Sequence, residues 1–162
     1  DPDDQADRDL VEQITGILPA IETDMTLFFR GLAHVPGGST DDDALLAPLL
    51  DAYYSPDDLA GDVRDATLAW LRNYSARVTR DGRPDADRAA AMNRVNPKYV
   101  LRNYLAQLAI DASEQGDHDM IGELLDVLRH PYDEQPGKER FAEKRPDWAR
   151  TRAGCSMLSC SS

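Results

Sequence analysis

Apolar residues recur every three or four positions along most of the chain, and this spacing predicts helices. The pattern opens with Leu10, Ile14, Ile17 and Ile21 and returns at 45–50, 59–78 and 120–128. Alternating runs rich in Val, Ile and Thr, which are typical of strands, do not occur in the sequence. We therefore expect an all-α fold, an irregular helical bundle without a sheet.

Short polar residues mark the starts of the early helices. Thr23 or Asp24 can cap a short helix that carries Phe28. The run 41–43 is Asp-Asp-Asp, which offers both a capping side chain and negative charge at the positive end of the next helix. Pro19 is expected to break or bend the first helix.

Two further start signals contain proline. Ser55 followed by Pro56 predicts a long helix that opens there and stops at Asp81-Gly82. Asn96 followed by Pro97 predicts a helix from Pro97 to about Gln115, with Gly116 past its end.

The amino-acid composition changes at residue 131. Pro131, Pro136 and Pro146 interrupt a polar stretch in which Tyr132, Phe141 and Trp148 are isolated aromatic residues. Such a segment predicts an extended tail whose aromatic side chains anchor it to another surface. We divide the chain into a helical part, residues 1–130, and an extended tail, residues 131–162.

Charge argues against two classes of partner. The 162 residues include 18 basic and 30 acidic side chains, a net charge of −12. Residues 1–65 hold 16 of the acids and only 3 of the bases. Proteins that bind duplex nucleic acid or lie on anionic membranes present basic faces. We therefore expect neither nucleic acid nor membrane as a partner.

Three acidic clusters are candidates for metal or acid–base sites: 41–43, Asp57 with Asp58, and Asp117 with Asp119. None has the alternating acids, the glycine and the closing glutamate of a calcium loop. Helix capping and solvated faces are the preferred explanation, and a metal-dependent hydrolase is only a minor alternative. The histidines, His34, His118 and His130, have no ligand-like spacing, and no phosphate-binding glycine loop occurs.

Two features suggest more than a surface role. Polar residues punctuate the apolar stretch 96–107, and wherever they are buried they must be hydrogen bonded. This candidate structural motif comprises Asn96, Pro97, Arg102, Asn103 and Gln107. The second feature is Cys160, a thiol near the end of the chain that can meet a distant cysteine without straining a packed core.

Four segments are distinctive: Asn-Pro-Lys-Tyr-Val-Leu-Arg-Asn-Tyr-Leu-Ala-Gln (96–107), Pro-Tyr-Asp-Glu-Gln-Pro-Gly (131–137), Pro-Asp-Trp-Ala (146–149) and Ser-Cys-Ser-Ser (159–162). They resemble the C-terminal region of the SelO/YdiU family. A fifth, Asp-Met-Thr-Leu-Phe-Phe-Arg (24–30), is similar to an earlier part of the same region. The order and spacing agree, so the chain resembles the C-terminal portion of a family member.

The resemblance implies an enzyme with a kinase-like fold, a pseudokinase that transfers AMP from ATP to Ser, Thr or Tyr hydroxyls of proteins. It implies ATP and Mg²⁺ or Mn²⁺ as cofactors, with the nucleotide flipped relative to ordinary kinases. The family's nucleotide-binding, metal-ligating and catalytic residues match no position of this chain. By this resemblance the chain is the helical C-terminal part of such a fold, and alone it is expected to be inactive.

One family residue maps onto this sequence. A cysteine, selenocysteine in some relatives, corresponds to Cys160, and the resemblance implies redox control through a bond with a cysteine of the kinase-like lobe. Cys155 stands five positions earlier, not at the C-x-x-C spacing of some members, so the spacing argues against a local redox pair of Cys155 with Cys160.

Further expectations concern context. The chain starts Asp1-Pro2 without an initiator Met, so we expect it to be part of a longer protein. Its partners would be the N-terminal kinase-like lobe of that protein and the protein substrates. The cytoplasm of a bacterium is the expected location. The alternative hypothesis is a non-enzymatic helical module that binds another protein.

Overall fold

The structure, a computed structural model, describes residues 5–155. It confirms the all-α prediction: those residues form seven α-helices and no strand, with one isolated bridge between Thr23 and Tyr53. The chain divides into two compact units, Asp1–Met92 and Asn93–Ser162. The division into residues 1–130 and 131–162 stays a prediction about domains. Within the described residues, no helix combines the length and the apolar character needed to cross a membrane.

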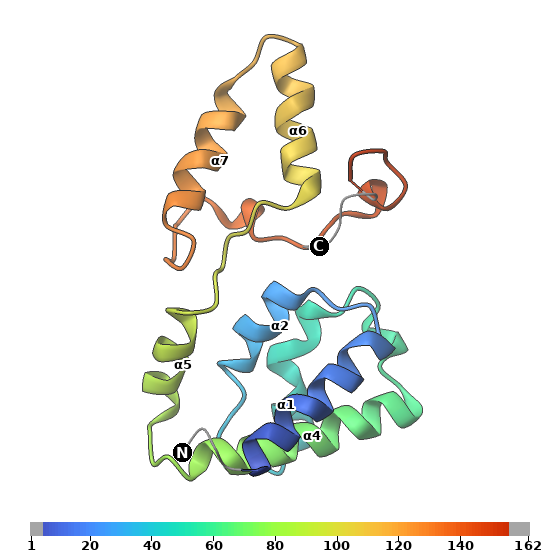
Figure 1. Cartoon of the computed structure of the whole chain (residues 1–162), viewed down its shortest axis with the longest axis vertical. Coiled ribbons are helices and arrows are strands. Elements are labelled where there is room, and N and C mark those ends of the chain that lie inside the picture. Colours follow the sequence, from blue (N-terminus) through green and yellow to red (C-terminus); the bar gives the residue numbers. More distant parts are fainter. Residues whose placement is uncertain (1–4, 156–162) are drawn as a thin grey trace. The chain divides into compact units, whose positions relative to one another are not determined.

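The first unit contains five α-helices. They are α1 (Gln5–Ile17), α2 (Met25–Leu32), α3 (Asp42–Leu46), α4 (Gly61–Thr79) and α5 (Asp85–Asn93). Figure 1 shows α1 lying along α4, the longest helix, and α3 also packs against α4. The helix α2 packs against the 3-10 segment Ala47–Ala52.

An aromatic cluster forms the centre of this unit. The ring of Trp70 stacks on Tyr74 at 5.4 Å between centroids and lies 6.5 Å from that of Phe28. The indole N–H of Trp70 donates to the carbonyl oxygen of Leu10 at 2.8 Å, which ties α4 to α1. Because a buried indole N–H needs an acceptor, this bond also fixes the ring in place.

Local capping follows the sequence closely. Asp24 accepts a hydrogen bond from the N–H of Leu27 and caps α2. Asp41 accepts from the N–H groups of Asp43 and Ala44 and caps α3. The 3-10 turn Leu18–Ala20 replaces the α-helix at Pro19, as the missing proline N–H predicts. These expectations are confirmed.

The predicted helix start at Ser55 is wrong. Pro56–Asp58 forms only a 3-10 turn, and the side chain of Ser55 makes no cap bond. The long helix α4 starts at Gly61, whose φ is +53°. A left-handed residue cannot lie inside a right-handed helix, so the turn and α4 are separate elements.

The second unit is built on a helical hairpin. The two helices, α6 (Asn103–Glu114) and α7 (Asp119–Arg129), lie side by side in Figure 1. Two 3-10 turns follow, Glu139–Phe141 and Asp147–Arg150. The core combines both helices with later residues: Tyr99, Tyr104, Leu105, Ala109, Leu124, Val127, Phe141, Ala142, Ala149 and Cys155.

The predicted helix from Pro97 to Gln115 is half wrong. Its C-terminal part exists as α6, but the helix begins at Asn103 and residues 97–102 are not helical. The N–H groups of Lys98 and Tyr99 both donate to the carbonyl oxygen of Pro131, at 2.7 and 3.1 Å. These two bonds attach the segment before α6 to the loop that follows α7.

The aromatic residues after residue 131 differ in burial. Phe141 is 1% exposed and anchors the segment to the core of the second unit, as predicted. Tyr132 and Trp148 are 46% and 42% exposed. Of the three expected anchors, Phe141 alone is fully buried.

Candidate functional site

Three of the segments that carry the family resemblance meet in the second unit. Segments 96–107 and 131–137 are joined by the two backbone bonds to Pro131 and by an ion pair between Lys98 and Glu134. The side chain of Gln135 donates to the carbonyl oxygens of Val127 and His130, at 3.0 and 2.8 Å. The C-terminal end of α7, with its free carbonyl groups, is thus capped by this loop.

The third segment, 146–149, lies beside α6. The ring of Trp148 meets Tyr104 edge to face at 6.3 Å between centroids. The hydroxyl of Tyr104 donates to the carbonyl oxygen of Glu143 at 3.1 Å. Aromatic packing and one hydrogen bond therefore hold residues 143–149 on the helix.

The candidate motif residues lie before α6 and in its first turns. Asn96, Pro97, Asn103 and Gln107 are half-buried, and Arg102 is buried. The amide nitrogen of Asn103 is shielded from solvent without a hydrogen-bond partner, whereas Gln107 donates to Asp111 at 2.9 Å. Their assignment as a functional motif stays a prediction.

The structure describes one of the two cysteines, Cys155, and not the other, Cys160. Cys155 is 1% exposed and belongs to the core of the second unit. Cys160 and the segment 159–162 lie outside the described residues, so the redox assignment of Cys160 stays a prediction. A buried thiol is a poor partner for exchange with another molecule.

A hollow of about 410 Å³ opens on the second unit. Its lining is mainly apolar and includes Leu108, Met120, Phe141 and Trp148, with Lys144 among the polar residues. Ligand pockets are commonly between about 300 and 1,000 Å³, so the hollow has room for a small molecule or a single peptide side chain.

Ion pairs cluster around the turn that borders this hollow. Glu123 of α7 receives both Lys138, at 2.6 Å, and Arg140. The hydrogen bond from Lys138 holds the pKa of Glu123 below its usual range, with Arg140 adding to the effect. Arg140 in turn lies over the ring of Phe141, with 4.6 Å between the guanidinium carbon and the ring centroid. These charges fasten the turn Glu139–Phe141 to α7.

Acidic residues of two of the three acidic clusters cap helices or form an ion pair. Asp41 and Asp117 accept backbone N–H groups, as capping side chains do, and Asp42 forms an ion pair with Arg72 at 2.6 Å. Among residues 5–155, no group of three or more His, Cys, Asp or Glu side chains is arranged to hold a metal ion. The three histidines are exposed; His118 lies 2.8 Å from the hydroxyl of Ser113, in the turn between α6 and α7.

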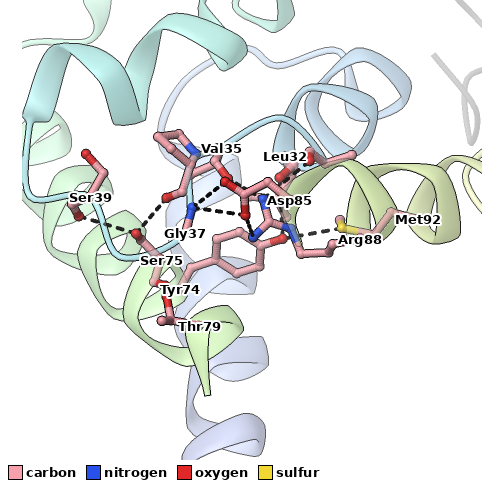
Figure 2. A network of polar contacts seen from close by, with 12 residues as sticks. Leu32, Val35, Gly37, Ser39, Tyr74, Ser75, Thr79, Asp85, Arg88 and Met92 are labelled. Carbon is pink, nitrogen blue, oxygen red and sulfur yellow. Dashed lines mark hydrogen bonds and ion pairs between the residues drawn. The ribbon is translucent and has the colours of Figure 1, made fainter. Parts of the chain in front are cut away.

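A buried arginine organises a second polar cluster, in the first unit. Figure 2 shows Arg88 of α5 reaching the loop that follows α2, where it donates to the carbonyl oxygen of Val35. Arg88 also pairs with Asp85 at 2.9 Å, and Asp85 accepts the N–H of Gly37 at 3.1 Å. In the same view, the hydroxyl of Ser75 donates to the carbonyl oxygen of Pro36 at 2.7 Å. All of these contacts are internal, so the cluster fastens the loop 33–39 between α4 and α5.

Several residues of these clusters were not singled out from the sequence. The sequence around Arg88 is rich in alanine, and this was the local feature from which burial of the Arg88 side chain could have been suspected. Asp111 and Arg152 form an ion pair across 41 positions, and no local pattern relates them. Only the folded chain brings such pairs together.

Comparison with known proteins identifies the family, although no family model matches the chain. The chain is 52% identical over 167 residues to the protein nucleotidyltransferase YdiU of Rhodopirellula baltica, covering 98% of the chain and 31% of that protein. It is 54% identical to the YdiU of Aromatoleum aromaticum and 56% identical to that of Tolumonas auensis, covering 96% of the chain and 29% of each protein.

This chain belongs to the YdiU family. The resemblance stated for segments 96–107, 131–137, 146–149 and 159–162 is thereby confirmed at the level of the family. The chain spans about 30% of the length of the YdiU relatives it matches. Those relatives carry the name nucleotidyltransferase, which makes the family one of transferases.

Proposed function

We propose that this chain is the helical C-terminal part of a protein nucleotidyltransferase that moves AMP from ATP to Ser, Thr or Tyr hydroxyls of proteins. The observation that supports the proposal is an identity of 52–56% to YdiU proteins along nearly the whole chain. In that reaction the hydroxyl oxygen bonds to the α-phosphorus of ATP, pyrophosphate leaves and the hydroxyl proton is released.

The described residues have a supporting role in this proposal. Residues 5–155 offer no cluster that fits Mg²⁺ or Mn²⁺, so we derive no step through a metal from them. ATP and the metal would bind to the remaining part of the protein, a kinase-like lobe. The joined segments 96–107 and 131–137 would give that lobe a rigid neighbour, and this chain alone would transfer nothing.

An experiment with ATP labelled at different phosphates tests the proposal. The whole protein, including the sequence upstream of Asp1, is incubated with a mixture of proteins and ATP labelled at either the α- or the γ-phosphate. AMP transfer labels protein from α-labelled ATP only, whereas a kinase labels it from γ-labelled ATP only. Residues 1–162 serve as the inactive control. Absence of α-label on protein would overturn the proposal and favour a non-enzymatic helical interaction module.

We further propose that Cys160 controls the enzyme by forming a disulfide with a cysteine of the kinase-like lobe. Support comes from the position of Cys160 in the family segment 159–162. Two thiols lose two electrons and two protons to an oxidant such as oxidised glutathione when the bond forms. Non-reducing electrophoresis of the whole protein should show a faster band that Cys160→Ser abolishes. An unchanged band pattern in Cys160→Ser would exclude this bond.

Charge and context complete the proposal. With a net charge of −12, the chain favours protein substrates and its own lobe over nucleic acid as partners. The location we propose is the bacterial cytoplasm, where ATP and the protein substrates are available.

A further inference from the structure

The last described turn of the chain, residues 151–155, is fastened to α6 by a charged side chain. Arg152 forms an ion pair with Asp111 of α6 at 2.6 Å between Nη2 and Oδ2. On its other side, the guanidinium carbon of Arg152 lies 5.6 Å from the ring centroid of Trp148. Arg152 is thus held between a carboxylate and an aromatic face, which limits the positions that the turn can take.

The backbone of the same turn also touches α6. Gly154 has a φ of +86°, and a Cβ placed on it would lie 2.4 Å from Oε1 of Gln107. Gln107 donates to Oδ1 of Asp111 at 2.9 Å. The carboxylate of Asp111 therefore binds both Gln107, which faces Gly154, and Arg152 of the turn. These two bonds also hold the pKa of Asp111 below its usual range, the one from Gln107 contributing more than that from Arg152.

The turn buries the thiol of Cys155. Its N–H donates to the carbonyl oxygen of Arg152 at 3.1 Å, and its side chain is 1% exposed. It shares a core with Tyr104, Ala109 and Ala149. Thiol–disulfide exchange needs an attacking thiolate that can approach one sulfur of the disulfide. Cys155 therefore becomes reactive only when the turn leaves α6.

We propose that residues 151–155 are a latch, closed by Arg152 and Asp111, that withholds Cys155 from thiol–disulfide exchange. The chain has two cysteines, so the latch leaves Cys160 as the one that exchanges. This biological meaning rests on the proposed redox role of Cys160, but the shielding of Cys155 does not. The inference names Arg152 as the residue that decides which thiol of this segment can form a disulfide.

Alkylation of Cys155 tests the latch. The whole protein carrying Cys160→Ser is treated with iodoacetamide, and mass spectrometry of the tryptic peptide that contains Cys155 follows its labelling. Sulfur displaces iodide and forms one carbon–sulfur bond, so no oxidant enters the measurement. We expect labelling at least about 100-fold slower in native protein than in guanidinium, because it must wait for local opening.

Charge variants decide whether the ion pair closes the latch. Arg152→Ala and Asp111→Asn should each raise the native labelling rate about two- to fivefold, because each removes a partly exposed ion pair that favours the closed state over the open one. The matched control is Arg150→Ala, since Arg150 pairs with Asp147 within its own turn. Its rate should equal that of the parent protein.

Three results would overturn the inference. One is native labelling as fast as labelling in guanidinium. The second is an unchanged rate in both Arg152→Ala and Asp111→Asn. The third is an Arg150→Ala rate raised as much as that of Arg152→Ala, which would indicate general loosening. A circular-dichroism melt of each variant separates latch opening from unfolding. None of these readings depends on AMP transfer or on a disulfide of Cys160.

Discussion

The N–H of Lys98 donates to the carbonyl oxygen of Pro131 at 2.7 Å, and this bond joins the segment before α6 to the loop that follows α7. Residues 97–102 are not helical. Two segments that carry the YdiU resemblance, 96–107 and 131–137, thereby become one structural feature.

Removing the buried arginine of the first unit should destabilise that unit. Arg88→Ala leaves the carbonyl oxygen of Val35 without this donor and the carboxylate of Asp85 with only the N–H of Gly37, at a cost of about 2–3 kcal/mol. Urea unfolding measures this in a Trp148→Phe background, where Trp70 alone reports on the first unit. The exposed Arg83 provides the control, and Arg83→Ala should change the stability by less than about 0.5 kcal/mol. Equal effects of the two substitutions would contradict the prediction.

Two glycines of the first unit should respond to alanine in opposite directions. A Cβ on Gly31 would lie 2.3 Å from the carbonyl oxygen of Pro48, so Gly31→Ala should cost about 1–3 kcal/mol. Nothing lies within 4 Å of a Cβ on Gly16, and Gly16→Ala should stabilise α1 by up to about 1 kcal/mol. The same Trp70 fluorescence reads both. A stabilising Gly31→Ala would show that α2 does not approach Pro48 this closely.

Acid should remove the contribution of Glu123. The pKa of Glu123 is lowered in the folded chain, chiefly by its hydrogen bond from Lys138, so its stabilising effect is complete above the unfolded pKa of about 4.3. It is lost as the pH falls through the lowered folded value. Glu123→Gln should therefore lower the melting temperature at neutral pH and make no difference near pH 2. Because the partners are partly exposed, the gap at neutral pH should correspond to less than about 1 kcal/mol.

Trp148 fluorescence in a Trp70→Phe background follows the Glu123 melts in the second unit. Asp126→Asn is a matched control on α7, because Asp126 pairs with the exposed Arg129 of the same helix. A gap between Glu123→Gln and the parent that persisted at low pH would point to lost packing instead of lost charge.

The phenol of Tyr53 should ionise at a higher pH than an ordinary tyrosine. Burial raises the pKa of Tyr53 to about 12, so the neutral phenol is favoured in the folded state. Its contribution to stability is complete below the unfolded pKa of about 10 and is lost as the pH rises through 12. The ultraviolet difference between the parent and Tyr53→Phe should titrate near 12 when folded and near 10 in denaturant. A folded midpoint near 10 would mean that the phenol reaches water.

Much of the local structure could be predicted from the sequence. The helical class, the caps at Asp24 and Asp41 and the break at Pro19 depend on bonds between residues within four positions of each other, and such bonds are written in the local sequence. The family could also be recognised, because its segments are continuous. The candidate residues Asn96, Pro97, Arg102, Asn103 and Gln107 could be singled out from the sequence, but their contacts could not be predicted.

The tertiary structure decided the rest. The helix predicted to start at Pro97 starts at Asn103, and the one predicted at Ser55 starts at Gly61, whose φ is positive. The bonds from Lys98 and Tyr99 to Pro131 and the ion pair of Arg152 with Asp111 join residues that are more than 30 positions apart. Local patterns cannot encode such contacts, because a backbone N–H or a charged side chain pairs with whichever partner the packed core brings within reach.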